Sequence, residues 1–333
     1  MRHVDSHVHM SISSLMEPAT GHNRRSHLSR QAKGMRITDA DIRDIFEPLA
    51  RHRRLTTRQL VAFGVRYPSI TRGRLGALWH GTEGERSHWL HRVNEDILFA
   101  NHLIVEDMHR LGEEAEALLV ERKIVSPDAW VDNTRIGGRS ASPSKIMRLA
   151  HDHMASDITI DIEIGARDAG ALFKSHLDIL RDAPLSTRMQ DKPLKIPVNL
   201  SGRRTFIEPD ALFAIRNRVF ALEADKGTES VKAVIVPKIL AYREIVAARI
   251  IDEHLAIDNL CVLFATTSQK RMRNVMDELA KVARDGRSAM FGFRTEETFG
   301  GFLKSPPPSG RLFTSPWARV GYPDLVLADL DTK

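Results

Sequence analysis

Three acidic residues lie at positions suited to hold a metal ion. Asp210 ends the segment Ile207-Glu-Pro-Asp210, and Glu223 and Asp225 end the apolar run that begins at Val219. Twelve residues separate Asp210 from Glu223, so two adjacent strands of a hairpin can bring both carboxylates to one end. Glu223 and Asp225 are two residues apart, so a strand points them to the same face. Converging carboxylates repel each other unless a cation lies between them. Their hard oxygens suit Mg²⁺ or Mn²⁺, which can activate a water for attack on phosphorus.

The acids also have a structural explanation that needs no metal. Acidic residues are common where a strand emerges into solvent, and Asp225-Lys-Gly-Thr228 has the composition of a polar turn. From the spacing alone, the metal site and the polar turn both remain open.

The segments around the acids alternate strand and helix signals. Apolar or alternating runs predict strands over residues 196–200, 205–215, 219–225 and 260–265. Helices are predicted over residues 237–254 and 268–283, because Pro237 suits a first turn and Ser268 can cap the second helix. This order predicts an α/β fold, α+β when the whole chain is considered. The remainder from residue 287, which includes three consecutive prolines, is predicted to be an irregular tail.

Residues 37–125 predict a helical module with a basic face. Helix starts are indicated at Thr38, at Thr56-Thr57 and at Ser69, followed by a wing strand at residues 87–93 and a helix at residues 112–123. Residues 37–94 contain ten Arg and six acidic residues. An Arg-rich helix after a tight turn is typical of helix-turn-helix domains that bind DNA.

The helix over residues 69–80 is then the one expected in the major groove of double-stranded DNA. Arg72 and Arg74 are predicted to contact phosphate or base, and Arg54 and Arg58 are further candidates for DNA contact. The alternative is an ordinary three-helix packing module with a solvated basic face.

The segment PDALF, then FALEADKGTES, then a helix with Lys238 and Tyr242, resembles the replication-relaxation family of mobile elements. The resemblance covers roughly residues 37–285. It implies a winged helix-turn-helix followed by a PD-(D/E)XK core, which is a restriction-endonuclease-like fold with a central mixed sheet flanked by helices. It also implies Asp210, Glu223 and Asp225 as the site positions.

The resemblance decides an ambiguous segment at residues 144–170. The isoleucines from Ile158 to Ile164 alternate with polar residues, which by pattern alone predicts a strand. In the related fold this segment is a helix that carries histidine, and His153 falls on it. We therefore predict a helix, on which Asp157, Asp161 and Glu163 are additional candidate acids.

The chain departs from the nuclease motif at one position. The motif has a lysine two residues after Glu223, where this chain has Asp225. Lys226 is one residue further, so its side chain points to the opposite face of a strand. Lys238 on the following helix could reach the acids instead, with Tyr242 one turn later. Without a lysine at the acids, the domain would bind nucleic acid but not cut it.

A rival motif and several protein classes can be weighed from composition. Val4-Asp-Ser-His-Val-His9 resembles the metal-binding H-x-H of amidohydrolases, but no eightfold βα alternation follows, so a histidine-rich arm is the alternative. The single cysteine, Cys261, excludes an internal disulfide and is expected to be a buried apolar residue. We find no signal peptide and no apolar run long enough to span a membrane, which predicts a cytoplasmic protein without membrane contact. The net charge of +6 weakly favours a polyanionic partner.

The predicted organisation is a basic arm, a winged helix-turn-helix, a linker, a nuclease-like domain and a tail, over residues 1–36, 37–125, 126–143, 144–286 and 287–333. The function expected is a DNA-binding protein with a metal-dependent endonuclease-like domain that acts on plasmid, phage or mobile-element DNA. A DNA-binding replication or transcription factor with an inactive nuclease fold is the alternative. A homodimer, relaxosome proteins and replication proteins are candidate partners.

Overall fold

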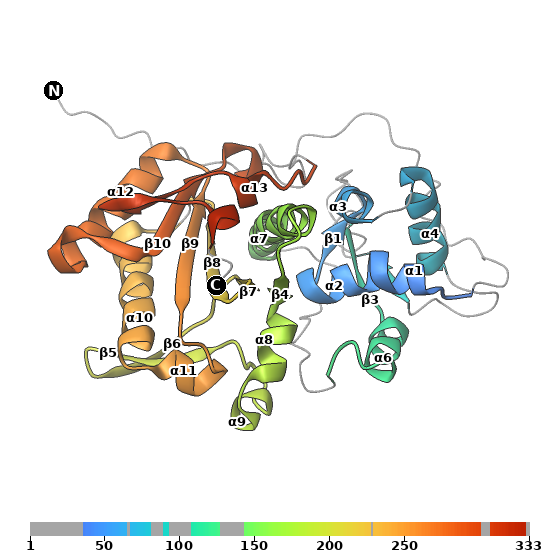
Figure 1. The fold of residues 1–333 in the computed structure, drawn as a ribbon, viewed down its shortest axis with the longest axis horizontal. Coiled ribbons are helices and arrows are strands. Elements are labelled where there is room, and N and C mark those ends of the chain that lie inside the picture. Colours follow the sequence, from blue (N-terminus) through green and yellow to red (C-terminus); the bar gives the residue numbers. More distant parts are fainter. Residues whose placement is uncertain are drawn as a thin grey trace.

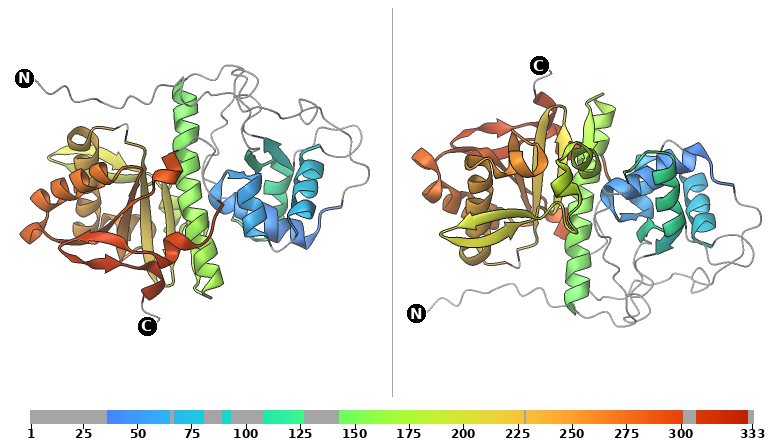
Figure 2. Two further views of the ribbon diagram at one scale, coloured as in Figure 1. Left: turned by 90° about the horizontal axis from the view of Figure 1, so that it is seen from above. Right: turned by 90° about the horizontal axis from the view of Figure 1, so that it is seen from below.

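The computed structural model of the protein describes residues 36–64, 67–80, 89–92, 108–126, 143–227, 229–300 and 307–330. The helices and strands form two parts, with the long helix α7 (Pro143–Asp168) between them (Figures 1 and 2). The predicted arm, including the His7-x-His9 motif, and nearly all of the predicted linker lie outside the described residues.

The first part is helical, with a small antiparallel sheet. Its helices are α1 (Asp39–Asp41), a π-helical turn (Ile42–Phe46), α2 (Glu47–His52), α3 (Thr57–Phe63), α4 (Pro68–His80) and α6 (Glu113–Glu121). Its described strands are β1 (Leu55–Thr56), β2 (Leu90–Arg92) and β3 (Met108–Leu111), in the order β1-β3-β2. Thr38 and Thr56 each form a capping box, which fixes the predicted helix starts.

The helix predicted over residues 144–170 is α7, and it explains the isoleucine alternation. Ile158 and Ile162 are four residues apart and pack on the large sheet, whereas Ile160 and Ile164 belong to the core shared with the first part. Two residues turn a helix by about 200°, so the period-2 pattern alternates between opposite sides of a helix that is buried on both.

The second part is built on a mixed sheet of seven described strands, in the order β12-β11-β10-β9-β8-β7-β4. These strands are β4 (Phe173–Ser175), β7 (Ala211–Ile215), β8 (Arg218–Asp225), β9 (Leu260–Thr266), β10 (Ser288–Thr295), β11 (Trp317–Val320) and β12 (Tyr322–Leu325). β8 is antiparallel to β7 and parallel to β9. The α/β prediction is therefore confirmed.

Helices cover both faces of this sheet (Figure 2). One face packs on α7 and α13 (Arg311–Thr314), and the other on α10 (Val236–Ala247) and α12 (Gln269–Val282). The helices α8 (His176–Asp182), α9 (Leu185–Arg188) and α11 (Ile250–Leu255) lie at the end of the sheet near a separate hairpin of β5 (Ile196–Leu200) and β6 (Arg203–Ile207) (Figure 1). No helix among the described residues is long and apolar enough to cross a membrane.

Three predicted elements differ from the structure. The single strand predicted over residues 205–215 is divided into β6 and β7 around Pro209, because proline cannot donate a ladder hydrogen bond. The helix predicted from Pro237 begins at Val231 as a π-helical turn capped by Ser230, and it ends before Arg249, which has a left-handed backbone.

The tail predicted to be irregular from residue 287 instead forms β10–β12 and α13. Phe291, Phe293 and Trp317 are buried in it. Of the prolines that suggested irregular structure, Pro307 and Pro308 lie just before α13, outside any helix or strand.

Candidate functional site

Asp210, immediately before β7, lies next to Glu223 of the antiparallel strand β8. The backbone amide of Asp210 donates to the Leu222 carbonyl at 3.0 Å. The amide of Ala224 in turn donates to Oδ2 of Asp210 at 2.7 Å. Pro209 ends β6 just before this point, so the chain turns here and places Asp210 at the mouth of the hairpin. The two carboxylates predicted to share a strand end are therefore neighbours.

Lys238 and Tyr242 of α10 both contact the carboxylate of Glu223. Nζ of Lys238 lies 2.9 Å from Oε2, and the Tyr242 hydroxyl donates to Oε1 at 2.5 Å. The two residues are four apart and so share one face of the helix. Glu223 and Tyr242 are buried, whereas the Lys238 side chain keeps some exposure. Lys238 therefore reaches Glu223, as predicted, and its chemical role stays a prediction.

The electrostatics of this cluster reflect burial and the two neighbouring carboxylates. Burial, followed by the charge of Asp210, raises the pKa of Glu223 to about 7, although Lys238 and Tyr242 favour the carboxylate. Burial lowers the pKa of Lys238, but the charges of Glu223 and Asp210 outweigh it and hold that pKa above its ordinary value. Lys238 is therefore an ammonium at neutral pH, placed beside a carboxyl group that can gain or lose a proton.

His151 of α7 is the residue that contacts Asp210, with Nε2 at 3.4 Å from Oδ2. Burial lowers its pKa, but Asp152 and Asp210 raise the pKa to about 10. From the sequence, His153 is the histidine of this helix that we predict at the site. That ring is buried against Asp157 at 3.4 Å, and burial lowers its pKa to about 4. The two histidines are about 200° apart on a helix, and only the placement of α7 against Asp210 distinguishes them.

Asp225 lies on the same face of β8 as Glu223 but has a different partner. Arg271 of α12 binds both of its oxygens, with Nη2 at 3.0 Å from Oδ1. Lys226 interacts electrostatically with Asp157 of α7, on the opposite face of β8, as predicted. Within the described ranges, no three His, Cys, Asp or Glu side chains are grouped to hold a metal ion. The predicted convergence of three acids is thus reduced to the pair Asp210 and Glu223.

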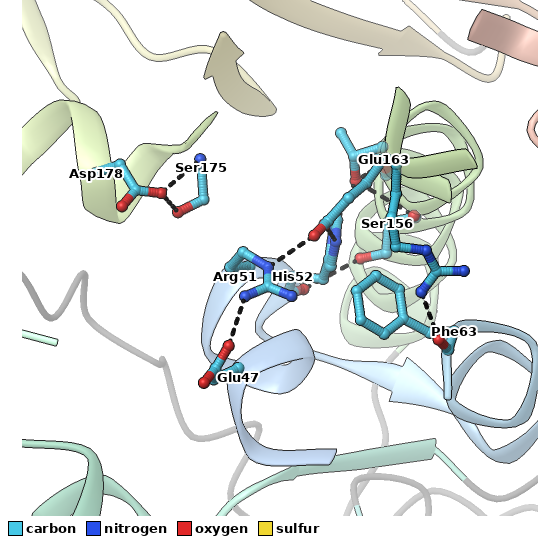
Figure 3. Close-up of polar contacts among 11 residues, drawn as sticks. Glu47, Arg51, His52, Phe63, Ser156, Glu163, Ser175 and Asp178 are labelled. Atoms are coloured by element: carbon cyan, nitrogen blue, oxygen red, sulfur yellow. Dashed lines mark hydrogen bonds and ion pairs between the residues drawn. The ribbon is translucent and has the colours of Figure 1, made fainter. Parts of the chain in front are cut away.

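The three further acids predicted on α7 are buried and hold segments together. Asp157 accepts from Gln59 of α3 at 2.5 Å, and Asp161 accepts three backbone amides at residues 309–312. Glu163 pairs with His52 at 2.5 Å and with Arg51 at 2.9 Å (Figure 3). These contacts are structural connections between α7 and its neighbours.

A cavity of about 300 Å³ lies where the first part, α7 and the start of β7 meet. His151 and Asp210 line it on one side, and the residues from Arg51 to Arg54 on the other. Asp210 is therefore accessible from a cavity between the two parts, whereas Glu223 is buried and does not line that cavity.

The four basic residues predicted to touch DNA have different environments. Arg54 is ion-paired with Asp152 of α7, and Arg74 binds the buried Asp41 through both oxygens, at 2.9 and 2.7 Å. Arg58 and Arg72 are exposed. Arg74 therefore fixes α4 to α1 through Asp41. Of the two arginines of α4 that were predicted to contact DNA, Arg72 is the one that faces solvent.

Comparison with known proteins identifies one family. Residues 46–259 match the replication-relaxation family. Membership in that family points to a role in the replication or transfer of plasmid and mobile-element DNA. No curated protein and no solved structure matches the chain.

Proposed function

The chain belongs to the replication-relaxation family, and we propose that it is a DNA-binding protein with a metal-dependent endonuclease site at Asp210, Glu223 and Lys238. The observation that carries the proposal is the contact of Lys238 with Glu223 at 2.9 Å, beside Asp210. Two acids and a lysine are the functional groups of the PD-(D/E)XK motif. Here the lysine comes from α10, because Asp225 occupies its usual position.

The order of elements supports a restriction-endonuclease-like core. The helix α7 is followed by the antiparallel strands β4, β7 and β8, then by α10 and the parallel strand β9. Asp210 immediately precedes the second of these strands and Glu223 lies on the third. This arrangement provides the two carboxylates from adjacent strands that the motif requires.

The residues present fit a divalent cation. Mg²⁺ is usually held by one or two carboxylates together with waters and substrate phosphates, and Asp210 and Glu223 provide two. The raised pKa of Glu223 indicates a carboxylate whose charge the protein compensates incompletely. We propose that these two residues hold Mg²⁺ or Mn²⁺, and that Asp225 does not, because a guanidinium binds both Asp225 oxygens whereas the partner of Glu223 Oε1 is the neutral hydroxyl of Tyr242.

Each side chain then has a role set by its contacts. The bound cation would polarise the scissile phosphate and activate a water. Lys238 would place an ammonium beside the phosphate and stabilise the charge that develops there. Tyr242 fixes the orientation of Glu223, and His151 fixes that of Asp210.

The first part supports DNA binding through its topology. The described elements run helix, strand, two helices and two strands, with the sheet order β1-β3-β2, and this order supports the proposal of a winged helix. Ser69, Ile70 and Arg72 are exposed in the first half of α4, the half that contacts bases in helix-turn-helix domains. We propose that this end of α4 enters the major groove. Contacts with a second copy or with relaxosome or replication proteins stay predictions.

A specific observation favours a second candidate, a DNA-binding factor that does not cut. Glu223 and Asp225 each have a cationic partner in Lys238 and Arg271, which is what a fold that had lost catalysis and bound no metal would need. In that case Lys238 is a structural cation.

Cleavage of supercoiled plasmid in Mg²⁺ or Mn²⁺, measured beside Asp210→Asn/Glu223→Gln, separates the candidates. The endonuclease predicts nicked or linear product from the unmodified protein, none from the double variant and none in EDTA. Retained gel shift without product in either metal supports the second candidate and overturns the first.

A further inference from the structure

The β5–β6 hairpin presents an exposed basic and aromatic face. Side chains alternate along its strands, and Ile196, Val198 and Ile207 are buried on the side toward α10. The opposite side carries Lys195, Asn199, Arg204 and Phe206. We call this side the outer face of the hairpin.

Phe206 is unusual because it is a large apolar side chain that is 47% exposed. The ammonium of Lys195 lies 4.6 Å from its ring centroid and the guanidinium of Arg204 lies 5.9 Å from it. Cations at these distances are attracted to the face of the ring. The phenyl group is thus held in place by its neighbours while much of its surface remains in water.

Among the described residues, no Asp or Glu forms an ion pair with Lys195 or Arg204, the two cations of the outer face. Folding of the hairpin does not require this face, since its stability comes from the buried side. An exposed ring among uncompensated cations fits a partner that offers flat rings and negative charge together.

The outer face leads directly to the candidate site. β6 ends at Ile207, and Asp210 follows three residues later. Asp210 is four positions after Phe206 in the chain, so their backbones are at most about 14 Å apart. Glu208 between them lines the cavity that contains Asp210 and His151. A strand of nucleic acid on the hairpin would therefore reach the acids within a few nucleotides.

We propose that the outer face of the β5–β6 hairpin binds an unpaired DNA strand, with a base stacked on Phe206 and phosphates on Lys195 and Arg204. Stacking requires a base whose face is free, and paired bases inside a duplex do not offer one. The substrate class is accordingly DNA with a single-stranded segment next to the point of cleavage. This inference rests on the proposed function and specifies its substrate.

The test measures the affinity of the full chain for three labelled DNAs of equal length by fluorescence anisotropy. These are a single strand, a blunt duplex and a duplex with a single-stranded overhang. The variants are Phe206→Ala and Phe206→Leu. Tyr322→Ala is the matched control, because Tyr322 is also exposed and lies between two arginines, Arg287 at 4.5 Å and Arg319 at 5.9 Å.

We expect Phe206→Ala and Phe206→Leu to weaken binding of the single strand and the overhang by roughly 5- to 100-fold. Binding of the blunt duplex, and all binding by Tyr322→Ala, should change less than about twofold on the same reasoning. Unchanged single-strand affinity in Phe206→Ala, or an equal loss in Tyr322→Ala, overturns the inference.

Two further outcomes separate this inference from the proposed function. Duplex binding without single-strand binding overturns the inference alone, whereas absence of binding to all three DNAs overturns both. Polyglutamate serves as a probe for an acidic protein partner. If it binds as tightly as the single strand, with the same dependence on Phe206, the hairpin recognises acidic protein and the DNA assignment is overturned.

Discussion

Replacement of Asp161 by alanine should destabilise the protein strongly. The Asp161 carboxylate accepts backbone amides from Ser309 at 2.6 Å, Gly310 at 3.0 Å and Leu312 at 2.7 Å, and it thereby fixes the start of α13 to α7. Ser309 is exposed, so water can replace its bond, but Gly310 and Leu312 are buried. Two buried donors without partners, at roughly 1.5–3 kcal/mol for each bond to a charged group, predict a loss of about 3–6 kcal/mol.

Urea denaturation followed by far-UV circular dichroism measures this loss as a change in the free energy of unfolding. Hydrogen exchange adds a local readout, because the amides of Gly310 and Leu312 should lose protection more than those of β8. Asp168→Ala, at the exposed end of the same helix, is the control. A loss below about 1 kcal/mol, with unchanged protection at both amides, would refute the reasoning that these bonds hold the segment.

Three other changes test separate parts of the structure. Arg72→Ala should weaken DNA binding and reduce its salt slope by about one, as measured by fluorescence anisotropy. Arg74→Ala should cost about 2–4 kcal/mol of stability in urea denaturation, because it removes a guanidinium that binds both oxygens of the buried Asp41. The reverse assignment would contradict the placement of α4. Gly165→Ala should destabilise the protein by about 1–3 kcal/mol, because the added Cβ would lie 2.5 Å from the Gly310 carbonyl oxygen. Thermal unfolding measures this loss, and an unchanged melting temperature would contradict the close contact of the two glycines. Cys261 should resist alkylation until the protein unfolds, because burial raises the pKa of its thiol to about 11, and rapid labelling of the folded protein would be inconsistent with that burial.

The strand that carries Glu223 was predictable from local signals, because adjacent residues determine the apolar run of β8. The cap at Ser268 is local in the same way. The single strand predicted across Asp210 was wrong, since Pro209 divides it into β6 and β7. The position of Lys238 beside Glu223 was also predictable, since the four-residue spacing of Lys238 and Tyr242 places both on one helix face.

The parts that were missed depend on contacts between distant segments. Nothing near Asp225 in the sequence indicates that Arg271, forty-six residues later, binds its carboxylate. The preference for His151 over His153 depends on the rotation of α7 against the sheet. The strands after residue 287 were missed because their alternation is weak and nearby prolines suggested a loop, although buried Phe291, Phe293 and Trp317 were a usable signal.

We propose that Lys238 acts as the lysine of a metal-dependent nuclease site. A second lysine of the chain, Lys226, provides a matched control for this proposal. Lys226 is closer to Glu223 in sequence but faces α7, on the other side of β8. The measurement is the rate of plasmid nicking in Mn²⁺ by Lys238→Ala and Lys226→Ala, each with its fold checked by circular dichroism. We predict a decrease of about 100-fold or more for Lys238→Ala and a change of less than about threefold for Lys226→Ala. Equal nicking by Lys238→Ala and the unmodified protein, or a loss confined to Lys226→Ala, would contradict the claim.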